Sequence, residues 1–110
     1  KYVIIYILTN GGNMRVRISY SVELEHVPNE VIRLLDESLN KICMARDMVE
    51  TLMYEIENDA IPPDRAKLAF KEIREELAKI DYEVADTDSI LQGYHAASNE
   101  PEEQKDVSEG

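Results

Sequence analysis

Two stretches of the chain repeat apolar residues every seven positions, the period of helices that pack along a common seam. The seam in 31–56 is formed by Leu35, Ile42, Val49 and Ile56, with Ser38, Ala45 and Leu52 between them. The seam in 66–94 alternates by four and three: Ala66, Phe70, Ile73, Leu77, Ile80, Val84, Thr87, Leu91 and Tyr94. The pattern predicts two long helices that exclude water between them.

Local signals set the ends of these helices. Pro28 and Asn29 suit a helix start, with Asn29 as the N-cap, so we expect the first helix over 29–58. Pro62 and Pro63 end that helix and suit the opening of the next, which is expected over 63–97. Because the turn between them is short, the helices are predicted to be antiparallel neighbours.

The two predicted helices differ in the width of their apolar stripes. The stripe of the first is widened by Ile32, Leu39 and Met53 on one side and by Leu34 and Met48 on the other. It therefore predicts a central helix that contacts more than one neighbour. The stripe of the second is narrow and predicts a peripheral helix. Residues 86–89 are poor helix material, but the unbroken phase favours a continuous or slightly bent helix over a restart there.

Residues 14–24 alternate strictly between apolar and polar side chains, which predicts a half-buried β-strand. The β-prone residues 2–8 and the turn residues 10–13 precede it and predict the first strand and turn of a β-hairpin. A rival hypothesis makes residues 1–13 a translated leader, because Asn-Gly-Gly-Asn before Met14 can be encoded by a sequence like a ribosome-binding site. In that case the strand pairs with a second copy of the chain.

The expected fold class is thus α+β: an N-terminal strand or hairpin packed on a long antiparallel two-helix hairpin, one domain over 14–97. Residues 98–110 are strongly acidic with one apolar side chain, Val107, and are expected to be disordered. So small a unit buries little apolar surface on its own, so we expect a homodimer.

Charge and composition narrow the classes of partner. The formal net charge of −11 opposes binding to nucleic acid phosphates and to anionic membranes. The longest apolar run, 2–8, is too short to span a bilayer. Cys43 is the single cysteine, which weakly favours a reducing, cytoplasmic compartment. Its neighbours Ile42, Ala45 and Val49 predict that it packs as a small hydrophobe.

No catalytic, cofactor or metal site is predicted. Glu72, Glu75, Glu83 and Asp86 resemble carboxylate pairs that hold magnesium, but they lie along one helix among lysines and arginines, as an ion-paired surface does. His26 has no Cys or carboxylate at ligand spacing, and no nucleophile–base pair can be assembled.

The expected function is a non-catalytic protein-interaction module, such as a bacterial or phage accessory protein. The candidate interaction residues are Met44, Met48, Met53 and Tyr54, with Arg15 and Arg17 on the strand. Two alternatives stay open: an acidic mimic of nucleic acid, and a small metal-dependent enzyme or ligand-sequestering protein that uses the carboxylates at 72–86.

Overall fold

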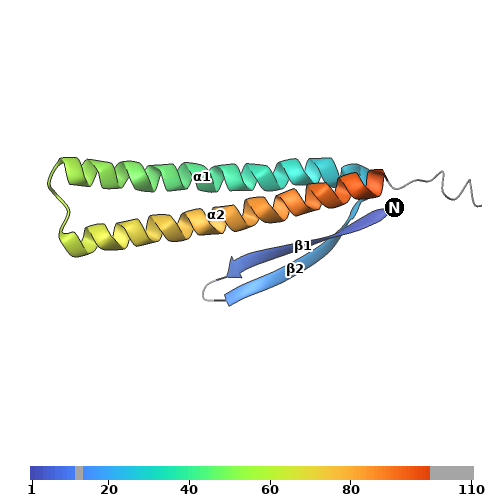
Figure 1. The fold of residues 1–110 in the computed structure, drawn as a ribbon, viewed down its shortest axis with the longest axis horizontal. Helices are drawn as coiled ribbons and strands as arrows, with labels where there is room; N and C mark the ends of the chain where they lie inside the picture. Colours follow the sequence, from blue (N-terminus) through green and yellow to red (C-terminus); the bar gives the residue numbers. More distant parts are fainter. Residues whose placement is uncertain (12–13, 100–110) are drawn as a thin grey trace, which may run out of the picture. The chain divides into compact units, whose positions relative to one another are not determined.

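The computed structural model describes residues 1–11 and 14–99. Their elements are β1 (Tyr2–Gly11), β2 (Met14–Glu23), the 3-10 turn η1 (Leu24–His26), α1 (Val27–Glu57) and α2 (Pro63–Ser98) (Figure 1). The contacts divide the chain into two compact units. One unit contains Lys1–Val31 and the chain from Asp86 onward, and the other contains Ile32–Ala85. The disorder predicted at the C-terminus falls almost entirely outside the described residues.

The first unit contains an antiparallel β-hairpin, which confirms the predicted α+β class. β1 and β2 pair along their whole length, with Ile5 opposite Tyr20 and Val3 opposite Val22. These four side chains share one face of the sheet because side chains alternate along each strand. Ile5 is buried to 1% exposure, whereas Ile4 and Tyr6 on the other face are more than half exposed. One face of the sheet is therefore buried at Ile5, and the other exposes the apolar β1 side chains Ile4 and Tyr6 to water.

The junction between hairpin and helix differs from the prediction. α1 begins at Val27, so Asn29 is not the N-cap but lies inside the first turn. Pro28 fits there because the first turn leaves its backbone N–H groups unbonded. Val27 is fully buried, and the Tyr20 hydroxyl donates a hydrogen bond to the Glu30 carboxylate. Burial of Val27 and this bond tie the end of β2 to the start of the helix.

The second unit contains the antiparallel helical hairpin. Its turn is a Schellman motif, in which the N–H of Ala60 donates to the carbonyl of Glu55 (2.9 Å) and that of Asp59 to Ile56 (3.1 Å). Asp59 adopts the left-handed conformation, with φ of 53°. Figure 1 shows α1 and α2 running side by side from this turn. Lys41 of α1 donates a hydrogen bond to Glu83 of α2, which sets the level of one helix against the other.

The buried seam between the helices is narrower than predicted. We define the inner seam as the buried residues of this unit: Ser38, Ala45 and Leu52 of α1, and Ile73 and Ile80 of α2. The prediction was right for these residues and wrong for the interleaved ones on both helices, which are 39–54% exposed: Leu35, Ile42, Val49, Ile56, Phe70, Leu77 and Val84. On each helix the buried residues of the seam are thus seven positions apart, one in every two turns. The other half of the predicted apolar stripe faces water.

α2 continues without a break through 86–89, which confirms the predicted continuous helix. In the first unit Thr87 is buried to 5% exposure and so continues the seven-residue repeat of Ile73 and Ile80. Burial at this position offsets the weak helix propensity of the Asp-Thr-Asp-Ser segment. None of the described helices has a stretch both long and apolar enough to cross a membrane.

Replacing Asp59 with glycine is expected to stabilise the fold. The left-handed conformation costs a residue with a Cβ more than it costs glycine, so Asp59→Gly should raise the free energy of unfolding by about 0.5–1 kcal/mol. Urea denaturation followed by circular dichroism measures this change. Asp59→Val, with a branched side chain in the same conformation, should lower stability, and equal stability of the two variants would contradict the assigned turn.

Replacing Ser38 with alanine is also expected to be stabilising. The Ser38 hydroxyl is buried at 2% exposure and has no hydrogen-bond partner among the residues that the structure describes. An unsatisfied buried hydroxyl costs about 1–3 kcal/mol, whereas alanine fills nearly the same volume without a polar atom. Ser38→Ala should therefore raise the free energy of unfolding by about 1 kcal/mol. Thermal denaturation tests this, with Ser89→Ala at an exposed helical position as the control, and a loss of stability in Ser38→Ala would contradict it.

Candidate functional site

The main candidate is an apolar surface of the helical hairpin. Along α1 a second stripe of large apolar side chains repeats at intervals of three and four residues and faces water. We call it the outer stripe, and its residues are 39–64% exposed: Ile32, Leu35, Leu39, Ile42, Val49, Met53 and Ile56. Arg46 occupies the one position of the repeat that is not apolar. Seven apolar side chains at this spacing form a continuous surface rather than scattered exposure.

The outer stripe is distinct from the inner seam. Consecutive residues of a helix are about 100° apart, which places the outer stripe roughly 90° around α1 from the inner seam. Both stripes have the spacing of a packing seam, but only the inner seam has its partner helix in the second unit. This helix therefore has an apolar face that α2 does not cover.

α2 adds apolar side chains to the same face. A groove of about 240 Å³ on the second unit is lined by Met48 and Glu55 of α1 and by Ala69 and Glu72 of α2. On each helix these residues lie to one side of the inner seam, and the exposed apolar residues lie to the other side. Phe70, Leu77 and Val84, which are 39–54% exposed, therefore share the face of the outer stripe.

The predicted interaction residues separate into different surfaces. Met53 belongs to the outer stripe, and Met48 lines the groove on the opposite face. Met44 and Tyr54 are 62% and 67% exposed but lie away from both stripes. Arg17 is exposed on β2, and the side chain of Arg15 lies outside the described part of the chain. The structure thus places Met53 in an apolar surface but does not gather the predicted residues into one site.

Cys43 is exposed, so the prediction that it packs as a small hydrophobe was wrong. It follows Ile42 in sequence and lies on the edge of the outer stripe away from α2, because 100° of rotation moves it past the apolar face.

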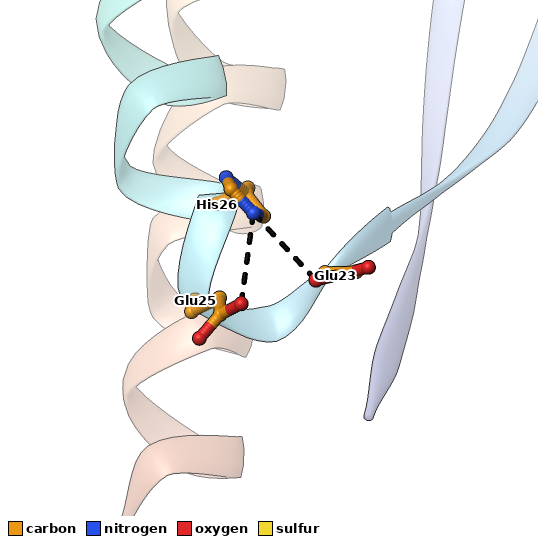
Figure 2. Close-up of side chains that lie close together, drawn as sticks. All are labelled: Glu23, Glu25 and His26. Atoms are coloured by element: carbon orange, nitrogen blue, oxygen red, sulfur yellow. Dashed lines mark ion pairs between the residues drawn. The ribbon is translucent and has the colours of Figure 1, made fainter.

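A small cluster of ionisable side chains surrounds His26 in the first unit (Figure 2). The His26 Nε2 atom lies 3.6 Å from a carboxylate oxygen of Glu23 and 3.6 Å from one of Glu25. In the described part of the chain these three residues are the set whose ligand atoms could share a metal ion. Their side chains are 47–78% exposed. The expectation that no carboxylate lies at ligand spacing from His26 was therefore wrong, but the three side chains of the cluster are exposed.

The carboxylates of α2 have different surroundings. Glu83 accepts a hydrogen bond from Lys41 across the helical hairpin. Glu72 lines the groove beside Arg65, and Glu75 is exposed. Among the described residues, no set of three that includes these carboxylates brings its ligand atoms within reach of one ion.

The outer stripe was partly visible in the sequence. Ile32, Leu39 and Met53 were identified as a widening of the first seam, but their continuity with Leu35, Ile42 and Val49 as a separate seam was missed. Both seams have the same period, so periodicity alone does not say which one is buried.

Comparison of the chain with models of protein families, with curated proteins and with solved structures gives no match. The functional argument therefore depends on the surfaces of the molecule itself.

The His26 cluster is expected to bind zinc only weakly. Its three ligands are exposed, and the hydrogen bond that the Tyr2 hydroxyl donates to a Glu23 carboxylate oxygen is long, at 3.5 Å, and orients that ligand only weakly. Zinc at ten times the protein concentration should therefore shift the melting temperature of the wild type and of His26→Gln equally. Differential scanning calorimetry provides the measurement, and a shift confined to the wild type would show that the cluster is a metal site.

Proposed function

We propose that this chain is a non-catalytic protein-interaction module whose binding surface is the outer stripe of α1 with its neighbours on α2. The observation that carries the proposal is the exposure of ten large apolar side chains on one face of the second unit. Isolated exposed apolar residues are common in proteins, but a contiguous patch of this kind is typical of a binding surface.

The composition of the face supports this role. Burying an aliphatic or aromatic side chain completely contributes about 1.5–3 kcal/mol. The residues of the outer stripe are only half buried, so a partner that covers them gains much of this free energy. The net charge of −11 on the whole chain opposes non-specific contacts between copies of the free protein.

The homodimer predicted from the size of the chain fits the same proposal. The two helices of the hairpin form a single layer, and its apolar face is left without a neighbour. A second layer of two helices over that face produces a four-helix arrangement. Self-association and binding of another protein use the same surface, so they compete.

Met53 and Met44 provide a matched test of the proposed surface. Both are methionines of α1 with 61% and 62% exposure, and they lie on opposite sides of the helix because nine residues turn it by about 180°. A photoreactive benzophenone side chain in place of Met53 should form covalent protein adducts in the native cells. The same group in place of Met44 should not.

Mass spectrometry identifies the adducts, whether they contain a second copy or another protein. Equal adduct yields from the two positions, or none from either, would overturn the proposed surface.

A further inference from the structure

We infer that the outer stripe is covered by a second copy of this chain, with α1 of one copy packed antiparallel against α1 of the other. This inference deepens the proposed function, because it names the occupant of the surface proposed there. The result is a four-helix bundle of two helical hairpins, placed face to face.

The available area suits a stable dimer. A completely exposed aliphatic side chain presents on the order of 100 Å² of apolar surface, by the same area relation that sets its transfer free energy. Ten side chains at roughly half exposure then amount to about 500 Å² of apolar side-chain surface per copy. A standard interface buries about 800 Å² per partner, of which roughly 60% is apolar. The face alone therefore provides the apolar part of a standard interface.

The charges on the two helices favour contact of α1 with α1. In the outer stripe of α1, Arg46 is the single charged position. The corresponding positions of α2, between Phe70, Leu77 and Val84, carry Arg74 and Asp81. Crossing the copies so that α1 faces the partner's α2 would bury those charges against an apolar stripe. Pairing α1 with α1 keeps the apolar stripes together and leaves Arg74 and Asp81 of α2 outside them. Arg46, the one charged member of the α1 stripe, is paired with Glu50 of its own helix.

The sequence of the stripe also sets the level of the two-fold axis. Antiparallel stripes overlap fully when the axis passes between Ile42 and Arg46, which places Ile32 opposite Ile56 of the other copy and Leu39 opposite Val49. Any shift by a heptad leaves an end of the stripe uncovered. The Lys41–Glu83 hydrogen bond places residue 80 of α2 at about the level of residue 44 of α1, where the axis passes. Leu77 and Val84 lie on either side of residue 80, so the axis places Leu77 of one copy opposite Val84 of the other.

The edge of this contact is acidic. The Arg46 Nε atom lies 3.5 Å from a carboxylate oxygen of Glu50 on the same helix and partly neutralises the charge of that carboxylate. Across the axis, Glu50 approaches Asp36 of the other copy, and these like charges repel. The affinity of the dimer is therefore expected to rise with salt concentration, because salt screens exposed charges.

Cys43 is the natural probe of the proposed axis, since it is exposed and is the single cysteine of the chain. With the axis near residue 44, Cys43 and its copy are offset by about 3 Å along the helices. A short bismaleimide should therefore convert most of the wild-type protein to covalent dimer at micromolar concentration. The control is the double variant Cys43→Ser with Glu50→Cys, which moves the thiol one heptad along the same edge of α1. The two thiols are then offset by about 18 Å along the helices, and the yield of covalent dimer should fall at least fivefold.

Light scattering on the same samples separates this inference from the proposed function. A dimer with equal crosslinking at both positions would indicate parallel helices and would overturn the antiparallel pairing, as would a dimer that crosslinks better from position 50. Either result leaves the proposed surface intact. A monomer at all concentrations and salt conditions would overturn the second copy as occupant and leave another protein to cover the stripe.

Discussion

The packing of α1 against α2 along the inner seam is the interaction on which the rest of the second unit depends. On α1 this seam contains the small residues Ser38 and Ala45, and on α2 it contains Ile73 and Ile80. Small side chains at two seam positions of one helix leave room that the larger seam residues of the other helix can fill. The Lys41–Glu83 hydrogen bond fixes the register of the two helices, that is, which residues of α1 lie beside which residues of α2. The larger residues beside this narrow seam stay exposed.

The exposure of the outer stripe follows from this choice of seam. A helix with two apolar seams roughly 90° apart requires two neighbours, and α2 is one of them. Had Leu35, Ile42 and Val49 formed the buried seam, the exposed side of α1 would have been smaller and more polar. The same helix that packs on α2 through its inner seam therefore also presents an exposed apolar face.

Much of the fold could be predicted from the sequence because its signals are local. The alternation at 14–24 and the turn residues before it predicted the hairpin, and the heptads with Pro62 and Pro63 predicted the two helices and their turn. The start of α1 was misplaced by two residues because Asn29 is a good cap in isolation, whereas burial of Val27 extends the helix. The choice between the two interleaved seams could not be predicted, because both seams have the same period. The His26 cluster was missed because the turn at 24–26 folds His26 back toward Glu23.

Coverage of the outer stripe in solution is the central claim, and methyl NMR with a soluble paramagnetic probe measures it most directly. If the stripe is a binding surface occupied by a second copy, the methyl groups of Leu39, Ile42 and Val49 should be shielded from the probe at high protein concentration and become accessible on dilution. The methyl group of Met44 should remain accessible throughout. Equal accessibility of all four methyl groups at every concentration would contradict the account.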